Sequence, residues 1–225
     1  MTTSANGCRG HVVVIAGATG RLGSALARAV LANGGKVAAA VRKPWQVVKL
    51  REQLGTEGVL VGLVPSLDTE AAAGFAKGAN DALGPVTAFV GAAGTFAPRT
   101  PGREPGSDLV DQLEANLLAN ATLARALLPG LRKRRRGRLV FVGAGSACLA
   151  AGSATFVAAK EAVHGFVRAL AADLASDPAV RGVEATMLQP DFAARMGDAE
   201  IASTVAALLA ALGPAAPGVL SPAGS

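Results

Sequence analysis

Tyrosine is absent from this chain of 225 residues, and cysteine and histidine occur only twice each. The lack of tyrosine excludes any mechanism in which this chain supplies a phenol as the proton donor. Cys8 and Cys148 lie far apart and match no metal-ligand spacing, so we expect no bound metal. Two isolated cysteines also favour a reducing compartment, and we therefore expect a cytoplasmic protein.

A membrane-spanning segment is not expected either. Residues 139–159 carry no charge over a length that would cross a bilayer. However, Gly143, Gly145 and Gly152 divide this stretch into a strand, a loop and the start of a helix. Near the N-terminus, Arg9 precedes a short apolar run that a first strand explains, so we predict no signal peptide and no membrane partner.

Acidic residues are outnumbered by basic ones, which leaves a formal net charge of +6. The densest part is a basic run at residues 132–138, between a helical pattern that ends near Leu131 and a strand pattern at 139–142. Cations complement the dipole at a helix C-terminus, so this run is predicted to be a solvated turn. No aromatic side chain lies within it to stack on bases, and we expect no nucleic-acid partner.

The most informative stretch is residues 12–23, VVVIAGATGRLG. Its β-branched run is too short for a helix, and a GxxGxxG triplet and then a helical pattern follow it. This order predicts a strand, a tight loop and a helix. Glycines in such a loop let the backbone approach a pyrophosphate, whose charge the helix N-terminus stabilises.

Strand and helix patterns alternate along the rest of the chain. Further strands are predicted at 36–41, 59–64, 86–90, 139–142 and 183–188, and further helices at 45–54, 68–83, 107–131, 154–175 and 198–212. We therefore predict an α/β fold with a single domain over residues 1–225, a Rossmann-like, doubly wound parallel sheet of six to seven strands with helices on both faces, and an irregular tail at 213–225. Ligands of such sheets bind beyond the carboxyl ends of the strands, here near Gly17, Arg42, Gly91, Gly143 and Pro190.

The residues after the second strand indicate which dinucleotide would bind. An acid at this position accepts a hydrogen bond from the ribose 2′-hydroxyl of NAD, whereas a base accommodates the 2′-phosphate of NADP. Here the strand ends in Arg42 and Lys43, and Arg21 lies in the glycine loop, with no Asp or Glu beside them in the sequence. NADP(H) is therefore the expected cofactor, and NAD(H) is less favoured.

Four segments resemble, in order, the motifs of the short-chain dehydrogenase/reductase family. They are the glycine loop 17–23, the turn Gly91-Ala92-Ala93-Gly94 where the family has Asn-Ala-Gly, Asn116 in the long helix, and Phe-Val-Ala-Ala-Lys at 156–160 where the family has Tyr-x-x-x-Lys. The GxxGxxG spacing is similar to that of the family's atypical or extended branch. The resemblance extends to about Leu212. It implies the family's fold and its reaction, hydride transfer between a nicotinamide and a carbonyl or alcohol carbon.

The resemblance also implies roles for single residues. In the family, a tyrosine moves the proton, a serine holds the substrate oxygen, a lysine holds the nicotinamide ribose and lowers the pKa of the tyrosine, and an asparagine holds a water. Lys160 and Asn116 match the lysine and the asparagine, whereas Phe156, at the tyrosine position, has no proton to give. The family's usual interval reaches Gly143 at the serine position, and Ser146 is the candidate three residues later. The expected cofactor-binding residues are Gly17, Thr19, Gly20, Arg21, Leu22, Gly23, Arg42, Ala92, Gly94, Lys160 and Pro190.

Two functions stay open at this point. One is an NADP-dependent oxidoreductase whose proton comes from an acidic group of its carbonyl or alcohol substrate, or from a water held by Asn116 or Lys160. The other is a catalytically inactive protein of the same fold that binds the cofactor and acts as a regulatory or structural partner. Nothing in the sequence is specific for a non-redox reaction on this scaffold. By the resemblance, helices 107–131 and 154–175 would pair across a two-fold axis in a homodimer or homotetramer.

Overall fold

A computed structural model describes residues 7–96, 99, 102–145, 154–190 and 196–213, and the backbone of 219–220. The described strands form one seven-stranded parallel sheet in the order β3-β2-β1-β4-β5-β6-β7. They are β1 (Val12–Ala16), β2 (Lys36–Val41), β3 (Val59–Leu63), β4 (Ala88–Gly91), β5 (Gly137–Val142), β6 (Val183–Leu188) and β7 (Val219–Leu220). The helices are α1 (Arg21–Ala32), α2 (Pro44–Leu54), α3 (Thr69–Leu83), α4 (Asp108–Leu113), the π-helical η1 (Glu114–Leu118), α5 (Ala119–Arg134), α6 (Ala154–Ser176), the 3₁₀-helical η3 (Pro178–Val180) and α7 (Asp198–Leu212).

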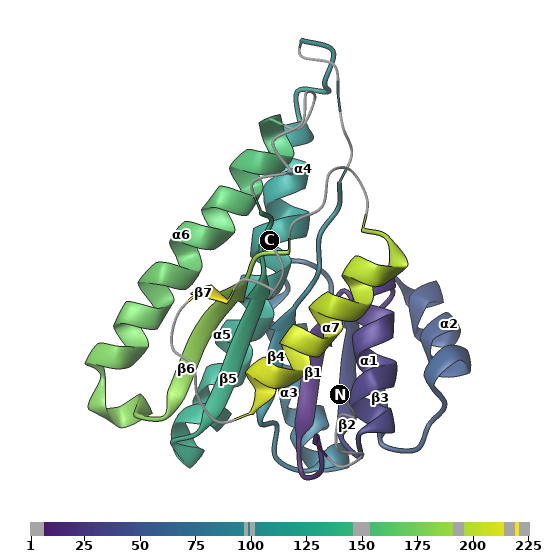
Figure 1. The fold of residues 1–225 in the computed structure, drawn as a ribbon, viewed down its shortest axis with the longest axis vertical. Coiled ribbons are helices and arrows are strands. Elements are labelled where there is room, and N and C mark those ends of the chain that lie inside the picture. The colour runs from purple at the N-terminus through teal and green to yellow at the C-terminus, as the bar shows by residue number, and fades with distance from the viewer. Residues whose placement is uncertain are drawn as a thin grey trace.

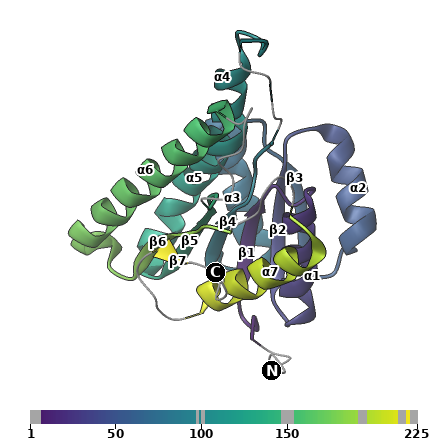
Figure 2. The same cartoon turned by 45° about the horizontal axis from the view of Figure 1, so that its top comes forward.

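Helices cover both faces of the sheet, as Figures 1 and 2 show. Alternate residues of β1 point to opposite faces: Val12 and Val14 pack in one core with α3, α5 and α6, while Val13 and Ile15 pack in the other with α1 and α7. No helix in the described ranges is long and apolar enough to cross a membrane. The predicted doubly wound Rossmann-like fold is thus confirmed.

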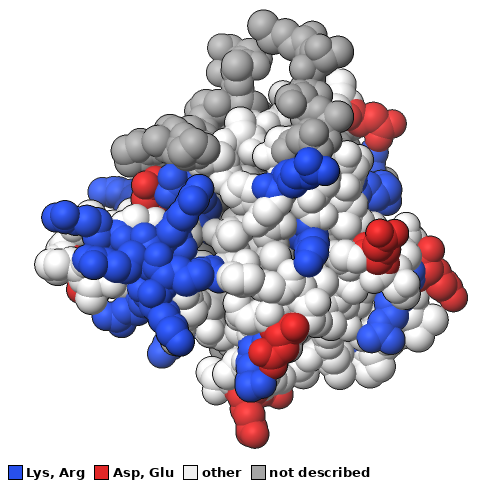
Figure 3. All heavy atoms as spheres, turned by 90° about the horizontal axis from the view of Figure 1, so that it is seen from below, with Lys and Arg blue, Asp and Glu red and all other residues white. Residues whose placement is uncertain are grey.

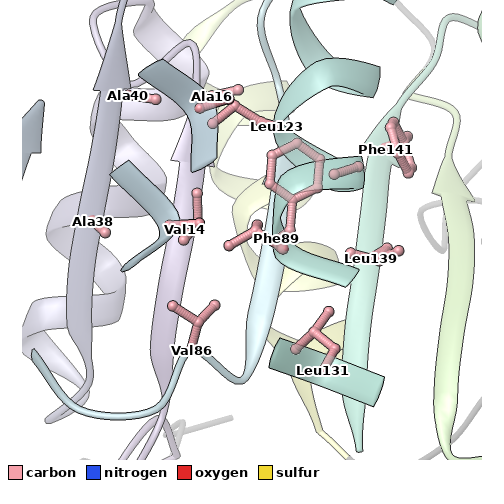
Figure 4. Packing of buried hydrophobic residues seen from close by; sticks show 14 of the residues in the cluster. Val14, Ala16, Ala38, Ala40, Val86, Phe89, Leu123, Leu131, Leu139 and Phe141 are labelled. Carbon is pink, nitrogen blue, oxygen red and sulfur yellow. The ribbon is translucent and has the colours of Figure 1, made fainter. Parts of the chain in front are cut away.

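The core beneath α3 and α5 combines small and large side chains (Figure 4). Ala38 and Ala40 of β2 are buried beside Val14, whereas β4 and β5 supply Phe89 and Phe141, whose rings meet edge to face with centroids 5.6 Å apart. In the register of the strands, Ala16 lies level with Ala40 on one side and Gly91 on the other, so that the loops after β1, β2 and β4 begin at one edge.

Several predicted bounds were wrong, among them the strands predicted at 86–90 and 139–142, which begin at Ala88 and Gly137. The helix predicted at 107–131 is three consecutive segments, because the π turn η1 interrupts it, and it continues to Arg134, with three cations complementing the dipole in its last turn. Arg135, with a left-handed φ of +53°, then ends the helix, so only part of the basic run is a turn. The tail predicted to be irregular contains β7, which extends the sheet by pairing Val219 with Met187 of β6.

Candidate functional site

The glycine loop between β1 and α1 is tightly packed on the neighbouring loop. Gly17 has a φ of +80°, and a Cβ at this position would lie 2.6 Å from the carbonyl oxygen of Ala92. The amide of Gly20 donates a hydrogen bond to the Gly17 carbonyl (3.0 Å), which closes the turn. At Gly23, a Cβ would lie 2.9 Å from Cα of Ala18. Gly17 therefore needs glycine for its backbone conformation and for close approach, and Gly23 needs it for close approach.

A cavity of about 160 Å³ opens beside this loop at the carboxyl ends of β1, β2 and β4. Six of the predicted cofactor-binding residues line it: Gly17, Thr19, Gly20, Arg42, Ala92 and Gly94. None of its described lining residues is acidic. A hollow with a glycine-rich wall and a cation at its rim fits the phosphate-bearing adenosine end of a dinucleotide.

Gln46, on α2, also lines this cavity, although it is not among the cofactor-binding residues predicted from the sequence. Its side-chain oxygen accepts hydrogen bonds from the backbone amides of Arg42 (3.1 Å) and Lys43 (3.0 Å), and its nitrogen donates to the Thr19 hydroxyl (3.4 Å). Gln46 thus ties the end of β2 to the glycine loop. A glutamine at the third position of a helix that begins with Pro44 is the sequence signal for this capping role.

Other predicted cofactor residues lie away from the cavity. Arg21 donates hydrogen bonds to the Met196 carbonyl (2.5 Å) and to the Asp198 carboxylate (2.6 Å), so in this structure it connects the glycine loop to the start of α7. Leu22 packs against the core beneath α1. Pro190 accepts a hydrogen bond from the amide of Gly145 (2.9 Å), which joins the loops after β5 and β6.

Asn116 is completely buried within the π turn η1. Its Nδ2 is surrounded by three acceptors, the Gln112 carbonyl and side-chain oxygens (both 3.0 Å) and the Thr95 carbonyl (3.3 Å). Its Oδ1 has no hydrogen-bond partner among the described residues, although it is buried. This oxygen is aimed at Gly94, where a Cβ would overlap it. A buried acceptor without a partner is costly, and a donor from a bound molecule or a water would satisfy it.

Asn120 supports the same region and was also missed. Its buried side chain donates to the Ala93 carbonyl (2.9 Å) and to the Asn116 carbonyl (2.7 Å), and it accepts from the Ala93 amide (3.3 Å). Through these bonds it fixes the loop after β4 against the π turn. The spacing of Asn116 and Asn120, four residues apart in an otherwise apolar pattern, was the available signal.

Lys160 and Phe156 lie on α6 beside Gly94. The Lys160 ammonium donates to the Val142 carbonyl (3.1 Å) and lies 5.7 Å from the centroid of the Phe156 ring. A Cβ on Gly94 would be 3.4 Å from Lys160 Nζ, so Lys160 and Asn116 approach the same backbone segment. The Phe156 ring is only 3% exposed and meets Phe96 edge to face, with centroids 4.9 Å apart. Phe96, which follows the loop after β4, had no signal in the sequence.

Some predictions concern residues outside the described ranges. Ser146, the candidate substrate-holding serine, is among them, as is Cys148. Gly143, at the serine position implied by the resemblance, is described, and its amide donates to the Leu188 carbonyl (2.8 Å). In the described part of the chain, no three His, Cys, Asp or Glu side chains are grouped so as to hold a metal ion.

Comparison with known proteins was made by sequence and by fold. The oxidoreductase BOA17 of Botryotinia fuckeliana is 31% identical over 177 residues, which cover 78% of this chain and 63% of BOA17, so the chain spans less than two thirds of that relative. The 3-oxoacyl-[acyl-carrier-protein] reductase FabG of Vibrio cholerae is 29% identical over 184 residues, covering 81% of this chain and 73% of FabG. A solved short-chain dehydrogenase from Streptomyces avermitilis has a similar fold, with a TM-score of 0.77 over 94% of this chain and 88% of that chain, at 22% identity.

The chain also matches a protein family over most of its length. Residues 11–200, from just before β1 to the first turn of α7, match the family described as short chain dehydrogenase. This range contains the glycine loop, the Gly94 turn, Asn116 and Lys160. Family membership implies a nicotinamide cofactor, and the glycine-lined cavity and the unpartnered Asn116 oxygen fit such a group. The chain belongs to the short-chain dehydrogenase family of oxidoreductases.

Proposed function

We propose that this protein is an NADP(H)-dependent oxidoreductase that acts on a carbonyl or alcohol carbon and works without the phenol on which its family relies. The observation that carries the proposal is the arrangement at one edge of the sheet. A glycine-lined cavity with Arg42, and with no acidic residue among its described lining residues, lies beside the loop after β4. The Asn116 amide and the Lys160 ammonium approach Gly94 in the same loop.

Arg42 supports the choice of NADP(H) over NAD(H). Arg42 lines the cavity and would pair with the 2′-phosphate of the adenosine ribose, and no carboxylate among the described lining residues competes for the 2′-hydroxyl. Arg21 contributes less to this choice than the sequence indicated, because it is held by Asp198. The preference therefore depends on Arg42 and on the adjacent Lys43.

A bound nicotinamide supplies or accepts the hydride, and the residues of the chain position the reactants. The Lys160 ammonium stabilises negative charge that develops on an oxygen beside it. The buried Asn116 oxygen, which has no partner among the described residues, would accept a hydrogen bond from a water or from the cofactor. Orientation of two reactants contributes several kcal/mol to a rate, and this contribution does not depend on a phenol.

The proton needs another source, because Phe156 stands at the position of the family's tyrosine and the chain contains no tyrosine. General acid catalysis contributes about 10²–10⁴ to a rate, so its loss slows the reaction without abolishing it. We propose that an acidic group of the substrate, or a water held by Asn116 or Lys160, supplies the proton. Relatives named as 3-oxoacyl reductases make a 3-oxoacyl thioester a reasonable member of a substrate panel.

The alternative is a protein that binds the cofactor without turnover, and the Phe96–Phe156 pair favours it. The two rings are packed edge to face, and the Phe156 ring is almost completely buried. An apolar pair beside Lys160 offers no donor to a substrate oxygen. In this case the cofactor would be a structural or sensing ligand.

Calorimetric titration with NADPH and NADH tests the cofactor assignment. We expect NADPH to bind more tightly than NADH. Arg42→Ala should weaken NADPH binding about tenfold, since one charge-assisted contact contributes about 1.5 kcal/mol, and should leave NADH binding unchanged. The matched control is Lys49→Ala, which removes a cation of α2 that does not line the cavity and should have no effect. The absence of binding by either nucleotide would overturn the oxidoreductase proposal.

Phe156→Tyr separates the two candidate functions. We expect wild-type protein with NADPH to reduce at least one member of a panel of aldehydes, ketones and 3-oxoacyl thioesters. If the wild type is active and Phe156→Tyr does not accelerate it, the proton comes from another source, as proposed. If the wild type is inactive but binds NADPH, and Phe156→Tyr gains reduction, the protein is a disabled reductase and the alternative is correct.

We also propose a homodimer or homotetramer through residues 107–131 and 154–175. Leu109 and Val110 of α4 are 45% and 62% exposed, which is unusual for two adjacent apolar side chains. Light scattering should give the mass of a dimer or tetramer, and Val110→Glu should shift it toward the monomer. A monomeric wild-type protein would contradict this assembly.

A further inference from the structure

A second cavity lies at the opposite edge of the sheet from the glycine loop. It measures about 780 Å³ and is formed where β1, β2, β4 and β5 begin. The strands are parallel, so this edge holds their amino ends. A five-residue strand such as β1 spans about 16 Å, which separates this cavity from the cofactor edge. Ligands of open α/β sheets bind at the carboxyl edge, so a cavity here belongs to a different site.

Five cationic side chains from separate segments line this amino-edge cavity. Arg9 precedes β1, Lys36 begins β2, and Arg134, Arg136 and Arg138 lie at the end of α5 and the start of β5. Figure 3 shows Lys and Arg gathering on one side of this face of the molecule, where α5 ends and β5 begins. None of the described residues that line the cavity is acidic. Residues 1–6 and 214–225 contain no Asp or Glu in their sequence.

Only part of this charge is compensated within the described structure. Arg138 forms an ion pair with Glu184 (3.0 Å), and the Lys36 ammonium donates to the Leu83 carbonyl (2.8 Å). Glu184 is thus the one carboxylate found paired with a lining cation in this part of the chain. Arg134 is half-buried, and burial lowers the pKa of its guanidinium, as expected for a cation that has lost water. Like charges held together raise the free energy of the fold unless an anion binds among them.

We propose that the amino-edge cavity is a binding site for a small organic molecule that carries two or more phosphate groups. The volume lies within the range of small-molecule sites. The cations would hold the phosphates, and Arg134 and Arg136 are near enough in sequence to contact adjacent phosphates from one wall. The apolar lining residues Val12, Pro85 and Leu212 would contact the organic part.

The shape and lining favour a compact ligand over a nucleic acid. A nucleic-acid surface tracks a backbone over many phosphates and uses aromatic side chains to stack on bases. This cavity is a hollow that holds no Phe or Trp among its lining residues. His11, the aromatic residue among the described lining residues, is engaged by the Thr87 hydroxyl (3.1 Å).

The test is calorimetric titration of the full chain with tripolyphosphate and with ATP at constant ionic strength. We expect both to bind, and ATP to bind more tightly because it also offers an organic part. Arg134→Gln/Arg136→Gln should weaken tripolyphosphate binding at least tenfold. The matched control is Lys133→Gln/Arg135→Gln, which removes the same charge from exposed positions outside the lining and should change binding less than twofold. Arg42→Ala, at the other edge, should leave tripolyphosphate binding unchanged.

Several results would overturn this proposal. If the two double variants weaken tripolyphosphate binding equally, the loss comes from net charge and not from the cavity. If Arg42→Ala loses tripolyphosphate binding, the phosphates bind at the cofactor edge. Tighter binding of a DNA duplex than of ATP would make the surface a nucleic-acid site. If Arg134→Gln/Arg136→Gln does not fold, Arg9→Gln takes its place. Arg9 is exposed and lines the cavity from the segment before β1, and Arg9→Gln should weaken tripolyphosphate binding several-fold. No binding by the wild type would also refute the proposal.

Discussion

Glycine occurs in the first turn of α1 and in the interior of α3, and the two helices should respond to alanine in opposite ways. Alanine in place of a helical glycine stabilises a protein by about 0.5–1 kcal/mol through backbone entropy. At Gly74 of α3, nothing lies within 4 Å of a new Cβ, so the full gain is expected. At Gly23 of α1, a Cβ would lie 2.8 Å from the Gly17 carbonyl carbon and 2.9 Å from Ala18 Cα, and closer still to the Gly17 oxygen.

The overlap at Gly23 involves only backbone atoms, which cannot rotate away as a side chain does. Overpacking of this kind costs about 1–3 kcal/mol. With the helix gain subtracted, Gly23→Ala should lose about 1 kcal/mol of unfolding free energy, which corresponds to a fall in Tm of about 2–4 °C for a chain of this size. Gly74→Ala should raise Tm by about 1–4 °C. The loop at Gly17 must shift to admit the methyl group, so Gly23→Ala should also weaken NADPH binding.

Thermal unfolding of the two variants beside the wild type measures the first effect, and calorimetric titration with NADPH measures the second. The expected pattern is a lower Tm and at least tenfold weaker NADPH binding for Gly23→Ala, with a higher Tm and unchanged binding for Gly74→Ala. A rise in Tm for both variants, with NADPH affinity intact, would refute the packing argument for the glycine loop.

Three further predictions follow from buried polar groups. Asn120→Ala should lower the free energy of unfolding by about 2–4 kcal/mol in urea titrations, since it leaves the buried amide and carbonyl of Ala93 without partners; a loss below 1 kcal/mol would contradict this. In the same urea titrations, Thr155→Val should lower the free energy of unfolding by about 1.5–3 kcal/mol. The Asp108 carboxylate, which is 4% exposed, then loses its hydrogen bond from the Thr155 hydroxyl, 2.5 Å away. An unchanged urea midpoint would contradict this prediction. Burial, and secondarily the Arg136 charge, lower the pKa of His11 below 6.5. The folded protein therefore binds this proton less readily than the unfolded chain, so stability should fall as pH drops below about 6.5, and His11→Asn should reduce that fall in urea titrations at several pH values.

The fold was predictable because its signals are local. The β-branched run of β1 and the apolar faces of the helices indicate element type, and alternation of the elements favours a parallel sheet with helices on both faces. The π turn around Asn116 was not predictable, because a π turn and an α turn have the same apolar composition. The end of α5 at Arg134 was missed for a related reason: cations stabilise a last helical turn as well as a solvated loop.

The candidate site was predictable where a residue is required by the backbone and less so where it depends on a neighbour. Gly17 and Gly94 lie where a Cβ would meet another segment, and their small size marked them in the sequence. Arg21 was assigned to the cofactor because of its position in the loop, yet Asp198, 177 residues later, holds it in this structure. Phe96 acquires its role only through contact with Phe156, sixty residues away, and no pattern indicates such a pair.

The amino-edge cavity could have been found by the argument that located the cofactor edge. Residues that follow the strands of a parallel sheet gather at one edge, and residues that precede the strands must gather at the other. Arg9, Lys36 and Arg136 each precede or begin a strand, and each is an ordinary surface cation in the sequence. The sheet order places β2, β1, β4 and β5 side by side, so these cations meet. The charges of the residues that precede each strand therefore predict whether the amino edge of the sheet attracts anions, independently of any cofactor motif.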